Sequence, residues 1–191
     1  MTLACTSLRA ATAAFVLAGS LAFATPAAAR QDDTRLGDLF NQLRAAPTDS
    51  AADAIEDQIW TIWLDHPGRE VLTLMRAGVQ LLHKDDFAGA VALFGRITTM
   101  APDYAEGWNK RANAHYLLGD YPAAVADIRK TLSLEPRHFA ALAGLGLVYL
   151  AIEEPAGALK AFEAALAINP HMTGIREQVD KLRKQLAGAA L

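Results

Sequence analysis

Apolar residues recur at helical spacing along most of this chain. Residues 36–43 and 175–186 each carry an apolar stripe with steps of three or four residues, and polar side chains fill the other positions. Residues 55–63 carry a third stripe of isoleucines, enlarged by two tryptophans. This spacing puts the apolar side chains on one face of a helix and predicts an all-α protein.

Between these stretches the pattern repeats every 34 residues. Each repeat ends at a proline, which disfavours helix in the preceding residue and lacks an amide hydrogen. The sequence therefore predicts three helical hairpins, at 71–104, 105–138 and 139–172. The residues that keep the period are Pro102, Pro136 and Pro170, Ala90, Ala124 and Ala158, and Phe94, Ile128 and Phe162.

Small residues stand at one equivalent position of the first helix in each hairpin. They are Gly78, Ala112 and Gly146. A small side chain there lets the paired helices approach closely, so we expect packing contacts at these sites. Gly144, two residues before the last of them, is expected to serve packing as well.

The 34-residue period with small central residues and a terminal proline resembles the tetratricopeptide repeat, a helix-turn-helix unit. The resemblance implies an α-solenoid. Residues 35–68 have the length of a repeat without its small-residue pattern, so we interpret them as a degenerate hairpin that caps the N-terminal end. The amphipathic helix expected at 173–187 would cap the C-terminal end, where a solenoid needs a polar outer surface.

The N-terminal segment 1–29 has the pattern of a secretory signal peptide. Arg9 precedes an apolar run at 11–24, and an A-x-A cleavage site ends at Ala29. The run is shorter than the roughly 20 residues needed to span a bilayer. We therefore expect no membrane span after cleavage, a flexible polar start at 30–34, and export, most simply to the periplasm of a Gram-negative bacterium.

Composition and motifs argue against catalysis. The formal net charge is −3 without a basic stripe, so we expect no nucleic-acid partner. The five histidines lack metal-ligand spacing, and no nucleophile or phosphate-loop motif is present. We predict a protein that is not an enzyme, with no catalytic residue, no metal and no cofactor.

The resemblance implies a concave groove lined by the first helix of each repeat, which would take a protein or peptide partner. An alternative is that the terminal caps fill this groove, leaving a purely structural accessory subunit. The groove residues it implies are Met75, Val79, Glu106, Asn109, Asn113, Tyr116 and Leu147.

One subgroup of the family holds a terminal carboxylate with lysine and asparagine on the first repeat and basic residues on the third. Met75 and Val79 occupy the first pair of positions here, and Ala140 and Gly144 the second. We therefore expect no such clamp, and no carboxylate-terminated chaperone tail as the partner.

The middle repeat places charge where the family has apolar residues, at Arg111 and His115. A buried arginine needs a partner, so one interpretation is an internal ion pair with Asp127 or Glu135. The other is a binding site for a small anionic or cell-wall ligand. The residues of that possible anion pocket are Lys110, Arg111, His115, Arg137 and His138.

Overall fold

The computed structural model describes residues 33–189, and the predicted signal peptide lies outside this range. The described chain forms nine α-helices, and none of them is long and apolar enough to cross a membrane. Their bounds are α1 Arg35–Ala45, α2 Asp49–Leu64, α3 Arg69–Leu82, α4 Phe87–Met100, α5 Ala105–Leu117, α6 Tyr121–Leu134, α7 Phe139–Ala151, α8 Pro155–Ile168 and α9 Thr173–Ala189.

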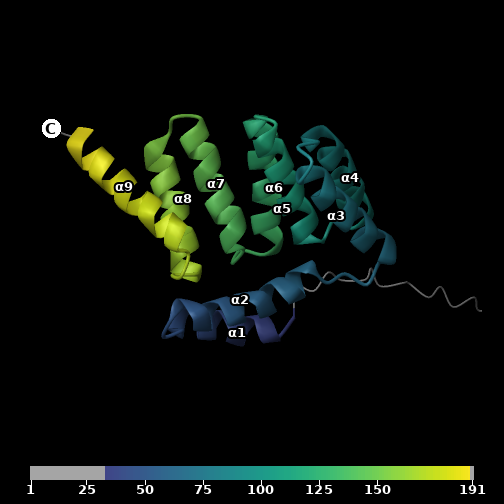
Figure 1. Cartoon of the computed structure of the whole chain (residues 1–191), viewed down its shortest axis with the longest axis horizontal. Helices are drawn as coiled ribbons and strands as arrows, with labels where there is room; N and C mark the ends of the chain where they lie inside the picture. The colour runs from purple at the N-terminus through teal and green to yellow at the C-terminus, as the bar shows by residue number, and fades with distance from the viewer. Residues whose placement is uncertain (1–32, 190–191) are drawn as a thin grey trace, which may run out of the picture.

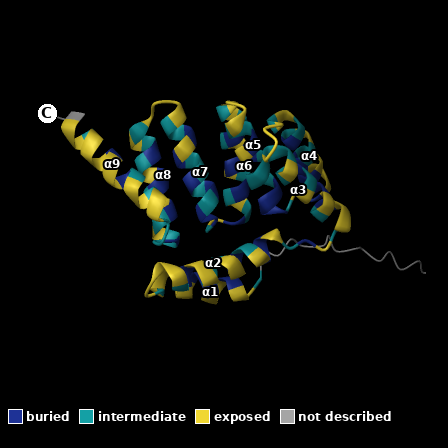
Figure 2. Ribbon diagram, in the orientation of Figure 1, coloured by how far each residue is buried: buried dark blue, intermediate teal, exposed yellow. Residues whose placement is uncertain are grey.

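Helices α3 to α9 stand side by side in one row (Figure 1). They pair as α3 with α4, α5 with α6, and α7 with α8, and each pair packs on the next. Val179 and Leu182 of α9 are buried against α8, while most of α9 is exposed (Figure 2). The predicted all-α solenoid of three hairpins is confirmed.

The small residues explain how closely the helices pair. A Cβ atom on Gly78 would overlap the ring of Phe94, and one on Gly146 would overlap the ring of Phe162. Both phenylalanines are fully buried. The predicted packing role is therefore confirmed for Gly78 and Gly146. It is wrong for Gly144, whose added Cβ would meet only the Ile128 side chain, at 3.9 Å.

The N-terminal hairpin does not extend the row. Figure 1 shows α1 and α2 lying crosswise beneath the upright helices. Helix α2 packs against α5, and the hairpin core includes Phe139 of α7. The predicted position at the end of the stack is therefore wrong. The physical reason is that Trp60 and Trp63 find apolar partners in the turns between repeats.

Helix α2 contacts the turn that ends each of the three repeats. Near its C-terminal end, the Tyr104 hydroxyl donates a hydrogen bond to the Leu64 carbonyl, at 3.1 Å. Trp63, the residue before Leu64, stacks on His138 with ring centroids 4.2 Å apart, and Trp60, about one turn earlier, packs edge-on against the same ring. Further back, the Asn169 amide donates to the Glu56 carboxylate, at 2.8 Å.

These contacts occur in order along α2. They run from Leu64 through Trp63 and Trp60 to Glu56, over about two turns of the helix. Helix α2 therefore crosses the repeats in the direction opposite to their order in the chain.

Candidate binding groove

A pocket of about 270 Å³ opens on the inner side of the middle and third repeats. Its floor is mostly apolar and comes from α7. Trp60 of α2 closes one side, and Met172 comes from the turn before α9. The lining residues from the repeats are Asn109, Lys110, Ala112, Asn113, Tyr116, Ile128, Ala140, Ala143, Gly144, Leu147 and Val148.

Four predicted groove residues line this pocket together: Asn109, Asn113, Tyr116 and Leu147. Asn113 is exposed, and Leu147 keeps 38% of its surface open to solvent. An asparagine amide offers both donors and an acceptor, which suits the backbone of an extended chain. The pocket thus combines apolar surface with groups that can bind a peptide backbone.

Two predicted groove residues lie elsewhere. Met75 and Val79 line a second hollow beside α3, which Leu64 of α2 borders. Met75 is buried in the core of the first repeat, and Val79 packs against that core. The hairpin therefore covers part of the inner face, but the pocket of the second and third repeats stays open.

Glu106 cannot contact a partner, because it is fully buried. Its carboxylate accepts hydrogen bonds from Asn109 and His138, both at 3.0 Å, and pairs with Lys110 at 3.1 Å. Burial alone would raise the pKa of Glu106, but the His138 hydrogen bond and the Lys110 charge outweigh it and hold the pKa below its ordinary value. The prediction of Glu106 as a groove residue is therefore wrong.

The geometry around His138 fixes its tautomer. The Ala141 amide donates to Nδ1 at 3.2 Å, so Nδ1 carries no proton and Nε2–H donates to Glu106. The ring caps the N-terminus of α7 and stacks on Trp63. His138 thereby ties α2, α5 and α7 together.

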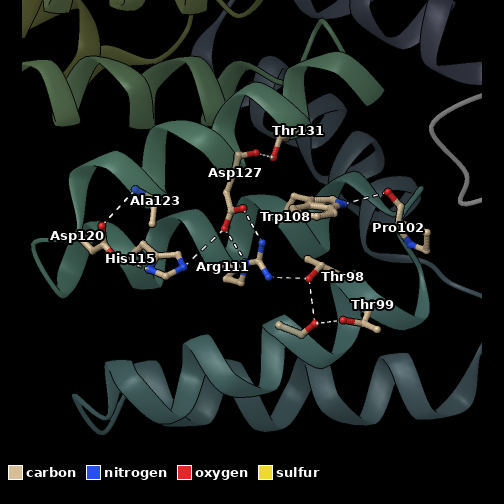
Figure 3. Close-up of polar contacts among 11 residues, drawn as sticks. Thr98, Thr99, Pro102, Trp108, Arg111, His115, Asp120, Ala123, Asp127 and Thr131 are labelled. Atoms are coloured by element: carbon tan, nitrogen blue, oxygen red, sulfur yellow. Dashed lines mark hydrogen bonds and ion pairs between the residues drawn. The ribbon is translucent and has the colours of Figure 1, made fainter.

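Arg111 lies between three helices (Figure 3). Its guanidinium makes two 2.7 Å hydrogen bonds to Asp127 of α6 and one of 2.8 Å to Thr98 of α4. The guanidinium also lies over the Trp108 ring, 4.8 Å from its centroid. This is the internal ion pair that one interpretation of the sequence anticipated.

The five residues of the possible anion pocket do not gather around one space. Lys110 and His138 face Glu106, Arg111 and His115 face Asp127, and Arg137 pairs with Glu135 at 2.8 Å. Each is already opposite a carboxylate, which removes the unpaired positive charge that an anionic ligand needs. The anion-pocket prediction is therefore wrong.

Sequence reasoning missed Trp60 and Gly144 as pocket residues. The signal for Trp60 was the pair of tryptophans three residues apart in one helix, because two such large apolar side chains need partners beyond their own hairpin. The signal for Gly144 was its repeat position, since Arg76 and Lys110 stand there in the other two repeats.

His66 makes stability depend on pH where the hairpin joins α3. Its ring packs on Tyr104, and its Nδ1 accepts a hydrogen bond from the Gly68 amide, at 2.9 Å. Burial lowers the pKa of His66 below 6.5, despite the opposing effect of nearby carboxylates. Below pH 6.5 the His66 ring therefore binds a proton more readily in the unfolded chain than in the folded chain. The free energy of unfolding falls as the pH drops below 6.5.

We expect His66→Asn to weaken this acid dependence, because asparagine retains an acceptor for the Gly68 amide but does not titrate. Urea unfolding at a series of pH values between 7 and about 5 measures the slope. Equal slopes for the variant and the wild type would show that His66 is not responsible.

The repeat geometry agrees with a comparison against known families. The sequence profile described as the tetratricopeptide repeat matches residues 76–132 and 110–173, which together cover just over half of the chain. The chain belongs to the tetratricopeptide repeat family. A tetratricopeptide repeat protein of Rhizobium etli is 32% identical over 154 residues, which are 81% of this chain and 76% of that protein.

Other tetratricopeptide proteins match shorter parts. A BBSome complex member BBS4 homolog of Drosophila melanogaster is 30% identical over 49% of this chain but only 19% of its own length. Among solved structures, the TPR2B domain of yeast Sti1, in complex with pHsp70, is 25% identical with a TM-score of 0.57, covering 62% of this chain and 99% of that one. MamA is similar in fold, with a TM-score of 0.58, 18% identity and coverage of 78% and 84%.

Proposed function

We propose that this protein is an exported scaffold that holds an extended segment of a partner protein in the groove between its second and third repeats. The observation that carries the proposal is the open pocket, which exposed Leu147 lines together with other apolar residues and with Asn109 and Asn113. Apolar surface with a few placed polar groups is typical of a binding site.

Relatives support binding of this kind. The Sti1 domain forms a complex with pHsp70, and the first repeat domain of RPAP3, similar in fold at 19% identity and a TM-score of 0.59, binds an HSP90 peptide. The pocket of this chain, however, does not suit an acidic peptide tail as its ligand. Lys110 at the pocket rim is already paired with Glu106, and Ala140 and Gly144 offer no charge.

The groove also favours binding over catalysis. The described residues include no group of three or more His, Cys, Asp or Glu side chains placed to hold a metal ion. Tetratricopeptide domains serve protein interaction, so we propose a role as a binding protein rather than as an enzyme.

Replacing Leu147 by aspartate should abolish most binding, because it puts a charge on the apolar wall of the pocket. Capped peptides selected by phage display on the folded protein serve as probes, and fluorescence anisotropy measures their affinity. We expect a loss of about 100-fold, which is the order for one buried charge without a partner.

Leu118→Asp is the matched control. Leu118 is 47% exposed, lies at the end of α5 and does not line the pocket. Its variant should bind the same peptides as the wild type does. Equal affinities for both aspartate variants would rule out the groove as the binding site.

Export rests on the signal-peptide pattern of residues 1–29. Fusing residues 1–34 to a reporter that is active only outside the cytoplasm tests it, with Leu17 and Leu21 replaced by arginine to break the apolar run as a control. We expect activity for the natural segment only. An inactive natural fusion would contradict export.

A further inference from the structure

The pocket exists because one repeat position lacks a side chain. The equivalent residue is Arg76 in the first repeat and Lys110 in the second, and in the third it is Gly144. A long side chain on α7 at this point would occupy the space that now lies between α5 and α7. An added Cβ atom at Gly144 would meet a single atom within 4 Å, so the space is open.

The hairpin closes the pocket on a second side. The Trp60 ring packs edge-on against Phe139, with centroids 5.9 Å apart, and its Nε1 donates to Glu56 at 3.0 Å. The Lys110 ammonium lies 5.6 Å from the centre of the Trp60 ring. These contacts hold the indole in place as one wall of the pocket. The other walls come from α5, α6, α7 and the turn before α9, so the pocket is more enclosed than a stretch of open groove.

The size of the pocket limits what it can hold. At about 270 Å³ it lies just under the range typical of sites for drug-sized ligands. It has room for one large side chain, and the exposed amide of Asn113 lies at its edge to bond the backbone on which such a side chain is carried.

Charge limits the occupant further. Among the described residues that line the pocket, Lys110 alone is charged, and its ammonium pairs with buried Glu106. An ionised side chain entering the pocket would lose its water without gaining a counter-ion, which is costly. The pocket therefore excludes acidic and basic side chains.

We propose that the space beside Gly144 is an anchor pocket for one large uncharged side chain, aromatic or long aliphatic, of the partner segment. This inference rests on the proposed function and adds the chemical class of the residue that the groove selects. Trp60 is the wall that an aromatic anchor contacts, so the hairpin is part of the site, and occupancy strengthens its attachment to the repeats.

The probes are single capped amino acids, which present one side chain between two amide groups. We would titrate the protein with N-acetyl-phenylalaninamide, N-acetyl-leucinamide and the amide of N-acetyl-aspartate, and follow the Leu147 methyl resonances by NMR. The first two should bind with a Kd of about 1 mM, as expected for ligands of this size. The aspartate compound should bind at least about tenfold more weakly.

Gly144→Leu tests the pocket without endangering the fold, because leucine favours helix over glycine and open space receives its side chain. It should abolish binding of both apolar probes. Gly174→Leu is the matched control: this glycine is exposed in α9, has no atom within 4 Å of its added Cβ, and does not line the pocket. It should leave binding unchanged.

Trp60→Ala should weaken the phenylalanine probe about tenfold, and the bound probe should slow hydrogen exchange in α2 of the wild type. Failure of the capped residues to bind, or equal binding by Gly144→Leu, would overturn the anchor pocket. If the anchor pocket is overturned in this way but the phage-selected peptides still bind Leu147→Asp more weakly than the wild type, the proposed function stands. If those peptides bind Leu147→Asp and the wild type equally well, the proposed function is wrong as well.

Discussion

Replacing Asp127 by alanine should lower the free energy of unfolding by about 3–5 kcal/mol, the usual cost of removing one partner from a buried ion pair. The Asp127 side chain is 6% exposed and that of Arg111 is 22% exposed. Without the carboxylate, the guanidinium keeps only Thr98 as a polar partner among the contacts seen in Figure 3, together with the Trp108 ring. Urea unfolding followed by circular dichroism measures the loss.

The third repeat supplies the control. Leu145 and Ala161 stand at the positions that Arg111 and Asp127 occupy in the second. The double variant Arg111→Leu with Asp127→Ala should therefore recover stability to within about 1 kcal/mol of the wild type, since apolar replacement of a buried pair is often neutral. A double variant as unstable as the single one would mean that the ion pair does more than satisfy a buried charge.

Glu106→Ala should also cost about 3–5 kcal/mol, because Lys110 and His138 lose their shared carboxylate in a buried site. The effect should extend to α2, since His138 lies between Glu106 and Trp63. Relative to the wild type, hydrogen exchange should speed up more in α2 than in α8, because the polar partners of Glu106 lie in α5 and at the start of α7. Hydrogen exchange followed by mass spectrometry distinguishes this local release from general destabilisation.

Glu106→Gln separates charge from shape. Glutamine keeps an oxygen that accepts from His138, so the loss should be smaller, about 1–2 kcal/mol. The contribution of the Glu106 charge to stability is complete above its ordinary pKa of 4.5 and is lost as the pH falls through its lower folded pKa. The glutamine variant should lack that part of the acid dependence. A variant curve parallel to the wild type below pH 4.5 would contradict this assignment.

The helices and their pairing could be predicted because they depend on residues close in sequence. Gly78 and Phe94 lie on the two helices of one hairpin, only 16 residues apart, and the glycine leaves room for the ring. The Arg111 partner was also predictable in outline, since a buried guanidinium requires an acid and Asp127 lies on the adjoining helix. Local spacing and elementary electrostatics were enough for these features.

The position of the hairpin could not be predicted in the same way. It depends on contacts such as that between Glu56 and Asn169, which are 113 residues apart and belong to no repeated pattern. The burial of Glu106 follows from it, because the hairpin covers the turn that carries His138. The repeat position of Glu106 predicts a groove residue, but the N-terminal hairpin lies across this position and makes Glu106 an interior residue.

The crosswise path of α2 has a consequence for how the chain acquires its structure. In a simple array of repeats each unit touches only its neighbours, so folding can begin anywhere and spread. Here Asp49 and Glu56 of α2 contact His171 and Asn169, which are 122 and 113 residues further along the chain. The hairpin cannot make these contacts until residues 169–171 have been synthesised. Its docking then joins all the repeats into one cooperative unit, so unfolding should proceed in a single transition rather than repeat by repeat.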